Sequence, residues 1–347
     1  MPRFARRRGG GDGLPADGEG SGALEGDAAV VTHAWLRARE RGRAVGLRGG
    51  DELGRLRKVV VQAQRKAFDQ KVFGGLQFGL RGAFGHEAGE ALALHMDVDA
   101  IGFTGSTRIG RRMLACAAES NLKRVYNELG GKSAFVVFND AKDVAAAARA
   151  AAGSVFYNQG ESCNAPTRLL VQQDVVPEFL AALQDEARKY LPGDPLDAAT
   201  EMGALVDAGQ MSTVLGYIHQ GQAEGANLAF GGRRVRTETG GYFVEPTIFE
   251  GVRNDMTIAR EEIFGPVLGV IPFTTEAEAL ALANDSVYGL QASVWSGQID
   301  RAHRVARGLK AGTVHVNQYD EDDITVPFGG YKQSGVGRDK SLHAFDK

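Results

Sequence analysis

Two spacings of hydrophobic residues alternate along residues 82–347, and together they predict helices and strands in alternation. Helical spacing of apolar residues is found at 87–95, 111–118, 144–155, 174–190, 207–224, 275–284 and 298–309. Short apolar runs, typical of buried strands, are found at 98–103, 134–138, 169–171, 227–230, 242–249, 267–273, 290–295 and 313–317. Such alternation is typical of α/β proteins with open, largely parallel sheets. We therefore predict an α/β fold.

Residues 1–81 have a different composition. They are rich in glycine, carry more basic than acidic side chains, and show no sustained period before a short apolar run at 55–61. Glycine-rich, low-complexity sequence is typical of disordered segments. A basic binding arm and a stretch that encodes no native domain are the alternatives. We expect this segment to be disordered or non-native.

Composition narrows the class of protein. A chain of 347 residues with 43% hydrophobic residues can bury a core and is long enough for two domains. A net charge of −3 does not suggest nucleic acid or an anionic membrane as a partner. No apolar run approaches the length of a membrane span, and the first residues lack the apolar region of a secretion signal.

Cysteine and histidine spacing predicts no metal site. The two cysteines form no CxxC pair, and the seven histidines form no HExxH motif. A reducing, cytoplasmic location follows as the default.

Cys163 is the first candidate for chemistry. It lies in residues 156–168 (FYNQGESCNAPTR), a glycine-containing segment between a predicted helix and a predicted strand. Reactive groups are often displayed on such loops. A thiol attacks carbon only as the thiolate, so a reactive Cys163 would need its pKa lowered from about 8.5 towards about 7. A buried structural cysteine is the alternative reading.

Residues 98–110 form a candidate anion site. A predicted strand leads into a turn with Gly105 and Ser106, and a helix follows. The free N–H groups and the dipole of a helix N-terminus favour a phosphate at this point. Glycine and serine also serve as ordinary helix caps, so this turn is a weak signal by itself. Cys116 lies within the helix among apolar residues, and we expect it to be core.

Five sequence blocks occur in a fixed order. They are residues 103–110 (FTGSTRIG), 128–133 (ELGGKS), 156–168, 261–266 (EEIFGP) and 327–335 (PFGGYKQSG). In this order they resemble the aldehyde dehydrogenase superfamily, and the resemblance covers about residues 82–347. Residues 323–343 look most like gamma-glutamyl-gamma-aminobutyraldehyde dehydrogenase and related aminoaldehyde enzymes.

The resemblance implies an aldehyde dehydrogenase-like fold with a partial Rossmann-type nucleotide-binding domain and an α/β catalytic domain. We place the remnant of the NAD(P)-binding domain at 82–127 and the catalytic domain at 128–330. Residues 331–347 would be a C-terminal segment that stops before the strand used for oligomerisation. A homo-oligomer is therefore expected, but in weakened form.

The resemblance also implies a reaction and roles. Cys163 would attack an aldehyde and pass through a thiohemiacetal and a thioester, with hydride transfer to NAD or NADP. Glu128 would act as the general base that activates water, which requires burial to raise its pKa. Taken without the other blocks, Glu128 would be a surface carboxylate. The adjacent glycines 130 and 131 favour close approach of a cofactor or a second backbone.

For the cofactor, the resemblance implies Gly105 and Ser106 at the pyrophosphate. It implies Glu262 at the nicotinamide ribose and Phe264 against the nicotinamide ring. A helix-start glutamate and a core phenylalanine are the alternatives for these last two. Weaker candidates are Lys132 and Gln210, and we expect Asn158 to support the thiol loop.

Three functions stay open at this point. The chain could be an active aldehyde dehydrogenase, an impaired remnant that lacks half of the cofactor site, or a thiol esterase. The family's asparagine of the oxyanion hole and its lysine for the adenosine ribose belong to blocks that residues 1–81 do not show. The acidic residues 320–323 suggest a cationic aldehyde as substrate, with a solvated acidic loop as the alternative.

Overall fold

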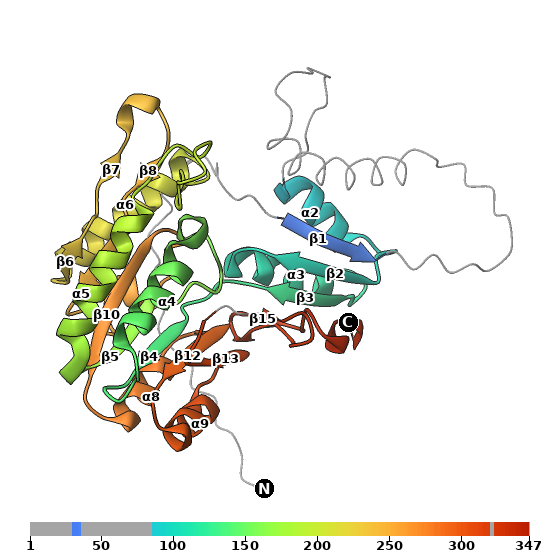
Figure 1. Cartoon of the computed structure of the whole chain (residues 1–347). Coiled ribbons are helices and arrows are strands. Elements are labelled where there is room, and N and C mark those ends of the chain that lie inside the picture. Colours follow the sequence, from blue (N-terminus) through green and yellow to red (C-terminus); the bar gives the residue numbers. More distant parts are fainter. Residues whose placement is uncertain (1–29, 36–84, 320–322, 347) are drawn as a thin grey trace, which may run out of the picture.

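The computed structural model describes residues 30–35, 85–319 and 323–346. In these residues the chain forms two main β-sheets, each with its own helices, which lie beside each other in the molecule (Figure 1). The larger sheet contains the strands of the predicted catalytic domain. The smaller sheet contains the strands on either side of the predicted anion site.

The larger sheet has seven strands in the order β13-β12-β4-β5-β10-β9-β6. Neighbouring strands pair parallel, except that β6 pairs antiparallel with β9. The strands are β4 (Ala134–Val137), β5 (Arg168–Gln172), β6 (Asn227–Phe230), β9 (Thr247–Glu250), β10 (Val267–Phe273), β12 (Gln291–Trp295) and β13 (Thr313–Val316). A largely parallel sheet is therefore confirmed.

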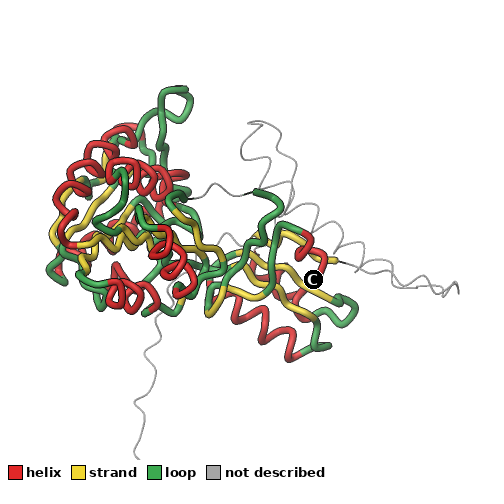
Figure 2. The backbone as a smooth tube through the Cα atoms, turned by 60° about the horizontal axis from the view of Figure 1, so that its bottom comes forward, coloured by secondary structure: helices red, strands yellow, loops and turns green. Residues whose placement is uncertain are grey.

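Helices cover both faces of this sheet (Figure 2). One face packs against α4 (Val144–Phe156) and α5 (Val176–Ala187). The other packs against α6 (Ala208–Ala223), α7 (Thr257–Arg260), α8 (Glu276–Asn284) and α9 (Ile299–Gly308). Because successive strand side chains point to opposite faces, Val136 joins one core and Val137 the other. Parallel strands buried on both faces explain the continuous apolar runs in the sequence.

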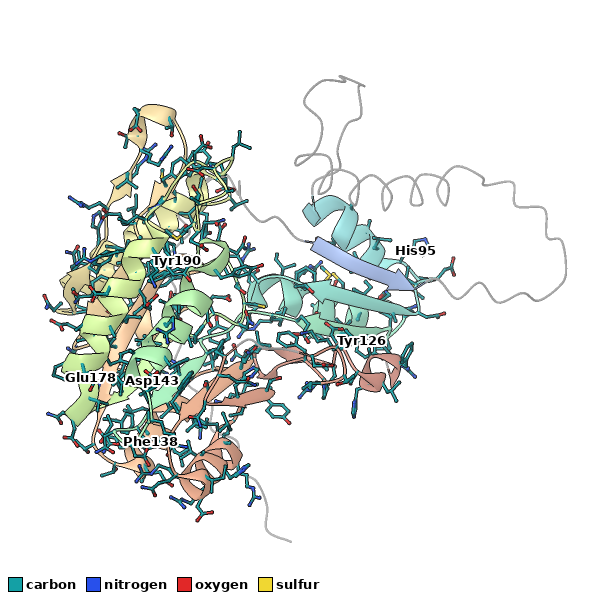
Figure 3. All side chains as sticks on the ribbon, in the orientation of Figure 1. His95, Tyr126, Phe138, Asp143, Glu178 and Tyr190 are labelled. Atoms are coloured by element: carbon teal, nitrogen blue, oxygen red, sulfur yellow. The ribbon has the colours of Figure 1, made fainter. Side chains whose placement is uncertain are left out.

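Helix α4 leads to the thiol loop. Alanine favours helix, and the alanines at 147, 148, 151 and 152 form a buried face spaced for a helix. The Asp143 carboxylate accepts the Ala146 N–H at 2.7 Å and caps the helix start. In Figure 3, Asp143 and Phe138 mark the end of this body far from the smaller sheet. The other end of α4 therefore carries Cys163 towards the smaller sheet.

The smaller sheet has the order β1-β2-β3-β15. Strands β2 (Ala100–Thr104) and β3 (Arg124–Glu128) are parallel, whereas β1 (Val30–Trp35) and β15 (Gly335–Val336) pair antiparallel at the two edges. Its helices are α2 (Gly85–Leu94) and α3 (Thr107–Glu119). Their core contains Cys116, which is fully buried, so the prediction of a core cysteine is confirmed.

One expectation is wrong at the level of elements. Residues 242–249 are two strands, β8 (Phe243–Val244) and β9, because Pro246 between them has no N–H to continue a ladder. Strand β1 lies within residues 1–81, and the expectation that this segment is disordered or non-native stays a prediction. The rest of residues 1–81 lies outside the described residues. The two-residue strands β7 (Arg234–Val235), β11 (Tyr288–Gly289) and β14 (Tyr331–Lys332) had no signal in the sequence.

One connection between the two sheets is five residues long. Strand β3 ends at Glu128 and β4 begins at Ala134, so residues 129–133 run from one sheet to the other. Strand β15 accompanies this crossing, since Gly335 pairs with Glu128. The block ELGGKS thus lies at the junction. Within the described residues, no helix has both the length and the apolar character to cross a membrane.

Candidate active site

The thiol loop lies between α4 and β5. After α4, the single turn η1 (Tyr157–Gly160) contains two left-handed residues, Asn158 and Gln159, with φ of 48° and 59°. The Asn158 side chain donates to the Glu161 carbonyl at 3.0 Å, which holds the turn closed as expected. A Cβ on Gly160 would lie 2.2 Å from the Gly265 carbonyl oxygen. The thiol loop therefore packs directly on the EEIFGP block.

The paired glycines of the ELGGKS block allow two close contacts. A Cβ on Gly131 would lie 2.2 Å from the carbonyl oxygen of Cys163. A Cβ on Gly130 would lie 2.1 Å from a carboxylate oxygen of Glu262. Real Cβ atoms do not approach a backbone oxygen so closely, so position 131 requires glycine, whereas a Cβ at position 130 would require the Glu262 carboxylate to move. The second backbone expected beside these glycines is that of the thiol loop.

Two carboxylates lie near the thiol. Glu128 and Glu262 both act electrostatically on Cys163. Glu128 is buried at the end of β3, so the surface reading of this carboxylate is wrong. Glu262 accepts the Gly131 N–H at 3.0 Å. A Cβ on Gly329 would lie 2.9 Å from Glu128 Oε1, which places the block 327–335 against the same carboxylate. Blocks far apart in the sequence therefore meet at one site.

The pKa of the Cys163 thiol depends on its burial and on the charges near it. Burial, and after it the negative charges of Glu262 and Glu128, raises the pKa of Cys163 to about 12. The backbone N–H groups of Cys163 and Asn164 favour the thiolate and oppose this shift in part. In this state of the protein the pKa of Cys163 is therefore far above the value of about 7 that a reactive thiol would need. Burial also raises the pKa of Glu262 to about 7, so a carboxylate with the basicity of a proton acceptor lies close to the thiol.

The turn before α3 matches the predicted anion site in part. Ser106 is the N-cap of α3, and its hydroxyl accepts the Ile109 N–H at 3.4 Å. No acidic side chain lies in the first turn of this 13-residue helix. The Gly105 N–H, however, donates to the Glu128 carbonyl at 3.1 Å. Gly105 therefore joins the turn to β3, and its N–H is already engaged.

Glu262 and Phe264 lie on the loop after α7. Glu262 is not in a helix, because α7 ends at Arg260. Phe264 is not core: 39% of it is exposed, and its φ is left-handed at 55°. The Gln210 side-chain amide donates to the carbonyls of Ile263 and Phe264 at 3.0 and 2.7 Å. An exposed aromatic ring beside a carboxylate suits a planar ring that is attached to a ribose.

Lys132 belongs to the crossing, residues 129–133, and its side chain is buried. Its ammonium group is buried, and in the described part of the chain no hydrogen-bond partner of Nζ is found. Burial, with the charge of Arg168 second, lowers the pKa of Lys132 to about 7. Lys132 lines a small cavity together with Arg168 and Tyr288. It is thus near the site but inside the protein.

Ser334 was missed as a separate site residue. It is fully buried, donates to the Gly130 carbonyl at 2.7 Å, and accepts the Gly289 N–H at 3.0 Å. Its carbonyl accepts the Leu129 N–H at 2.9 Å. Its only signal was membership of the block 327–335. The role of that block follows only from its contacts with the crossing in the folded chain.

The acidic loop is described only at its end. Residues 320–322 lie outside the described part, and Asp323 is exposed, with its carboxylate accepting the Thr325 N–H at 2.7 Å. Within residues 30–35, 85–319 and 323–346, no group of three or more metal-ligating side chains is found.

Comparison with known proteins identifies the family of this chain. The model of the aldehyde dehydrogenase family matches residues 74–347. The NADP/NAD-dependent aldehyde dehydrogenase PuuC of Escherichia coli (strain K12) is 53% identical over 264 residues, which are 76% of this chain and 52% of PuuC. The chain spans about half the length of the curated relatives it matches.

Solved structures show the same fold. An indole-3-acetaldehyde dehydrogenase in complex with NAD+ superposes with a TM-score of 0.76 at 56% identity, over 76% of this chain and 54% of that chain. A gamma-glutamyl-gamma-aminobutyraldehyde dehydrogenase from Burkholderia cenocepacia J2315 superposes with a TM-score of 0.75 at 52% identity, over 82% and 57%. The predicted α/β, aldehyde dehydrogenase-like fold is confirmed, and the chain belongs to the aldehyde dehydrogenase family.

Proposed function

We propose that this protein oxidises an aldehyde to a carboxylic acid with NAD or NADP as electron acceptor, through a covalent intermediate on Cys163. The observation that carries the proposal is the convergence of Glu128, Glu262 and the thiol loop at the junction of the two sheets. A nucleophile, a buried carboxylate and a second carboxylate with a pKa of about 7 are the groups that this chemistry needs.

The chain's own residues would act in two stages. The Cys163 sulfur bonds to the carbonyl carbon as its proton passes to a neighbouring carboxylate, and the N–H groups of Cys163 and Asn164 face the reacting centre. Oxidation then leaves a thioester on Cys163. In the second stage Glu128 takes a proton from water, the water oxygen bonds to the acyl carbon, and the carbon–sulfur bond breaks, which releases the carboxylic acid and leaves Cys163 as the thiolate.

The residues at the junction fit a nicotinamide cofactor. Ser106 at the start of α3 would face the pyrophosphate, Glu262 would accept from ribose hydroxyls, and Phe264 would contact the ring. When bound, the cofactor supplies the electron sink that accepts the hydride and a positive charge that favours the thiolate. Gln210 would act by holding the Phe264 loop, and Lys132 through charge from inside the protein.

Turnover by the purified full chain tests the proposal. We expect NADH or NADPH absorbance to rise on mixing with an aldehyde, and Cys163→Ala to abolish the rise. Glu128→Gln should keep a first-turnover burst but slow the steady state by about 10²–10⁴-fold, because deacylation loses its base. Cys116→Ala is the matched control and should keep the activity.

Other outcomes would favour the alternatives. Cleavage of p-nitrophenyl acetate without NADH formation would favour a thiol esterase. A folded protein with neither activity would favour a catalytically impaired remnant that lacks half the cofactor site. Either result would contradict the proposal.

We propose an aminoaldehyde as substrate, which is a narrower claim. The acidic residues 320–323 follow β13, and one of the similar solved structures is a gamma-glutamyl-gamma-aminobutyraldehyde dehydrogenase. A cationic aldehyde should therefore have a higher kcat/KM than a neutral aldehyde of equal length. Replacing the four carboxylates by amides should remove the preference, and equal turnover before and after the replacement would contradict it.

The remaining features follow from the same assignment. We propose nucleotide-binding residues at 82–127, catalytic residues at 128–330 and a C-terminal segment at 331–347. A catalytic thiol must stay reduced, so we also propose a cytoplasmic location. Oligomeric state is a further proposal, and sedimentation of the purified chain would test it.

A further inference from the structure

A series of hydrogen bonds joins the two neighbours of Cys163 to a buried histidine. The Ser162 hydroxyl donates to Asn164 Oδ1 at 2.5 Å, and Asn164 Nδ2 donates to Gln291 Oε1 at 3.3 Å. Gln291 Nε2 then lies 2.7 Å from His315 Nε2. The series therefore runs from the thiol loop into the first residues of β12 and on to β13.

The inner half of the series is buried. Gln291 is 2% exposed and His315 is 6% exposed. Polar groups buried at this depth need partners, and a fully paired network fixes one arrangement of side chains. Neighbouring parallel strands hold the two residues, because His315 is in register with Ser293 of β12. The strands thus supply a rigid support.

Each hydrogen bond of the series is donated in the same direction, from the thiol loop towards His315. Asn164 presents its NH2 to Gln291 Oε1, so Gln291 presents its own NH2 to His315. His315 Nε2 must then be the acceptor, which is the neutral tautomer with the proton on Nδ1. Each amide along the series is oriented by the next. Without the acceptor on His315, the Gln291 amide has no reason to keep its orientation.

The outer end of the series controls the backbone at the thiol. The backbone N–H groups of Cys163 and Asn164 favour the thiolate of Cys163 against the effect of burial. Asn164 is held at its side chain by Ser162 and Gln291, and at its carbonyl by the Tyr319 hydroxyl at 2.5 Å. The Tyr319 ring lies 5.5 Å from the His315 ring. A fixed Asn164 therefore fixes the two donors that face the sulfur.

We propose that Gln291 and His315 are positioning residues that hold the backbone donors of residues 163 and 164 on the catalytic thiol. The inference rests on the proposed role of Cys163 as nucleophile. The alternative is that these buried hydrogen bonds only stabilise the sheet.

Alkylation of Cys163 by iodoacetamide, followed by mass spectrometry of its peptide across a range of pH, tests the proposal. Gln291→Leu and His315→Phe should slow alkylation about three- to tenfold at a fixed pH and move the profile to higher pH, because the thiolate loses donors. His315→Gln offers an acceptor again and should restore most of the rate. If Gln291→Leu does not fold, Gln291→Met takes its place in the test.

Ser293→Ala is the matched control. Ser293 is fully buried on the same strand and donates to the Gln318 carbonyl at 2.7 Å, away from the thiol loop. It should lower stability without changing the alkylation profile. The double variant of Gln291 and His315 should be no slower than either single variant, because both act through one series.

Unchanged or faster alkylation in the folded Gln291 and His315 variants, or an equal effect of Ser293→Ala, would overturn the proposal. The assay uses neither aldehyde nor cofactor. Failure of the protein to form NADH would therefore contradict the proposed function and leave this comparison intact.

Discussion

At the scale of single residues, Lys132 places an amine in a buried position, where burial disfavours its charged form. A base whose pKa is lowered from 10.5 to about 7 binds fewer protons when folded than when unfolded between those values. The free energy of unfolding should therefore rise as pH increases from about 7 to 10.5. Lys132→Met should stabilise the protein at pH 7 by on the order of 2 kcal/mol and flatten this rise.

Urea denaturation at several pH values measures the effect. Lys310 lines the same cavity but is exposed, so Lys310→Met is the control and should change stability by less than about 0.5 kcal/mol. A Lys132→Met variant that is less stable than the parent at pH 7 would show that the amine has a binding role in the cavity.

Glu262 should produce a slope of the opposite sign. Its pKa rises from 4.5 to about 7 on folding, so the folded protein binds more protons in that window. The free energy of unfolding should then fall as pH increases from about 4.5 to 7. Glu262→Gln should remove this fall, whereas Glu261→Gln on the exposed neighbouring residue should keep it. Equal pH profiles for the two variants would contradict the burial assigned to Glu262.

The sequence blocks predicted which segments would meet, but they could not predict the ionisation of the thiol. Cys163, Glu128, Glu262 and Phe264 stand in sequence blocks whose order is specific, and the structure brings their segments together. The direction of the Cys163 pKa shift depends on how much water the folded loop excludes and on which charges face it. Both depend on the tertiary structure and cannot be predicted from the local sequence.

At the scale of elements, the start of α4 can be altered without a change at its other end, which leads to the thiol loop. Asp143 caps the helix, and Asp143→Ala should lower the free energy of unfolding by about 1 kcal/mol. Asp143→Asn keeps an acceptor oxygen and should lose much less. Because Cys163 follows the opposite end of α4, thermal denaturation should change while Cys163 alkylation stays the same. A change in alkylation would mean that the cap controls the thiol loop.

Elements with strong periodicity were predicted almost to the residue. Strand β10 coincides with its apolar run, and α6 differs from its prediction by one residue at each end, because both bury continuous apolar sequence. Two-residue strands such as β11 and β14 are too short to show a period. They form because β14 returns to pair with β11 over a long sequence separation, which no local pattern encodes.

At the scale of the whole molecule, the site forms where strand ends of the two sheets face each other. Glu128 and Thr104 are the last residues of parallel strands in the smaller sheet, and ligands of such sheets bind beyond these carboxyl ends. In the larger sheet, the crossing and the thiol loop precede the first residues of β4 and β5. Glu128 and the turn at Ser106 therefore come from the smaller sheet, whereas the thiol loop and the loop with Glu262 and Phe264 come from the body of the larger sheet.

Ser334 joins these parts and offers a test of how they are held. Its hydroxyl links the crossing at Gly130 to Gly289 of β11, and its backbone belongs to the segment just before β15. Ser334→Ala would leave a buried carbonyl and a buried N–H without this partner, which should destabilise the protein by about 2–3 kcal/mol. Ser154→Ala is the control, since Ser154 only donates to Ala150 within α4.

The expected result goes beyond stability, because Gly130 packs on the Glu262 carboxylate. A shift of the crossing should move Glu262 and change the pH window in which this carboxylate affects unfolding. Urea denaturation of Ser334→Ala between pH 4.5 and 7 should therefore show a smaller slope than the parent protein, while Ser154→Ala keeps it. A loss of stability with an unchanged slope would mean that the crossing holds its position without Ser334, and that the two sheets are joined mainly by their main-chain hydrogen bonds.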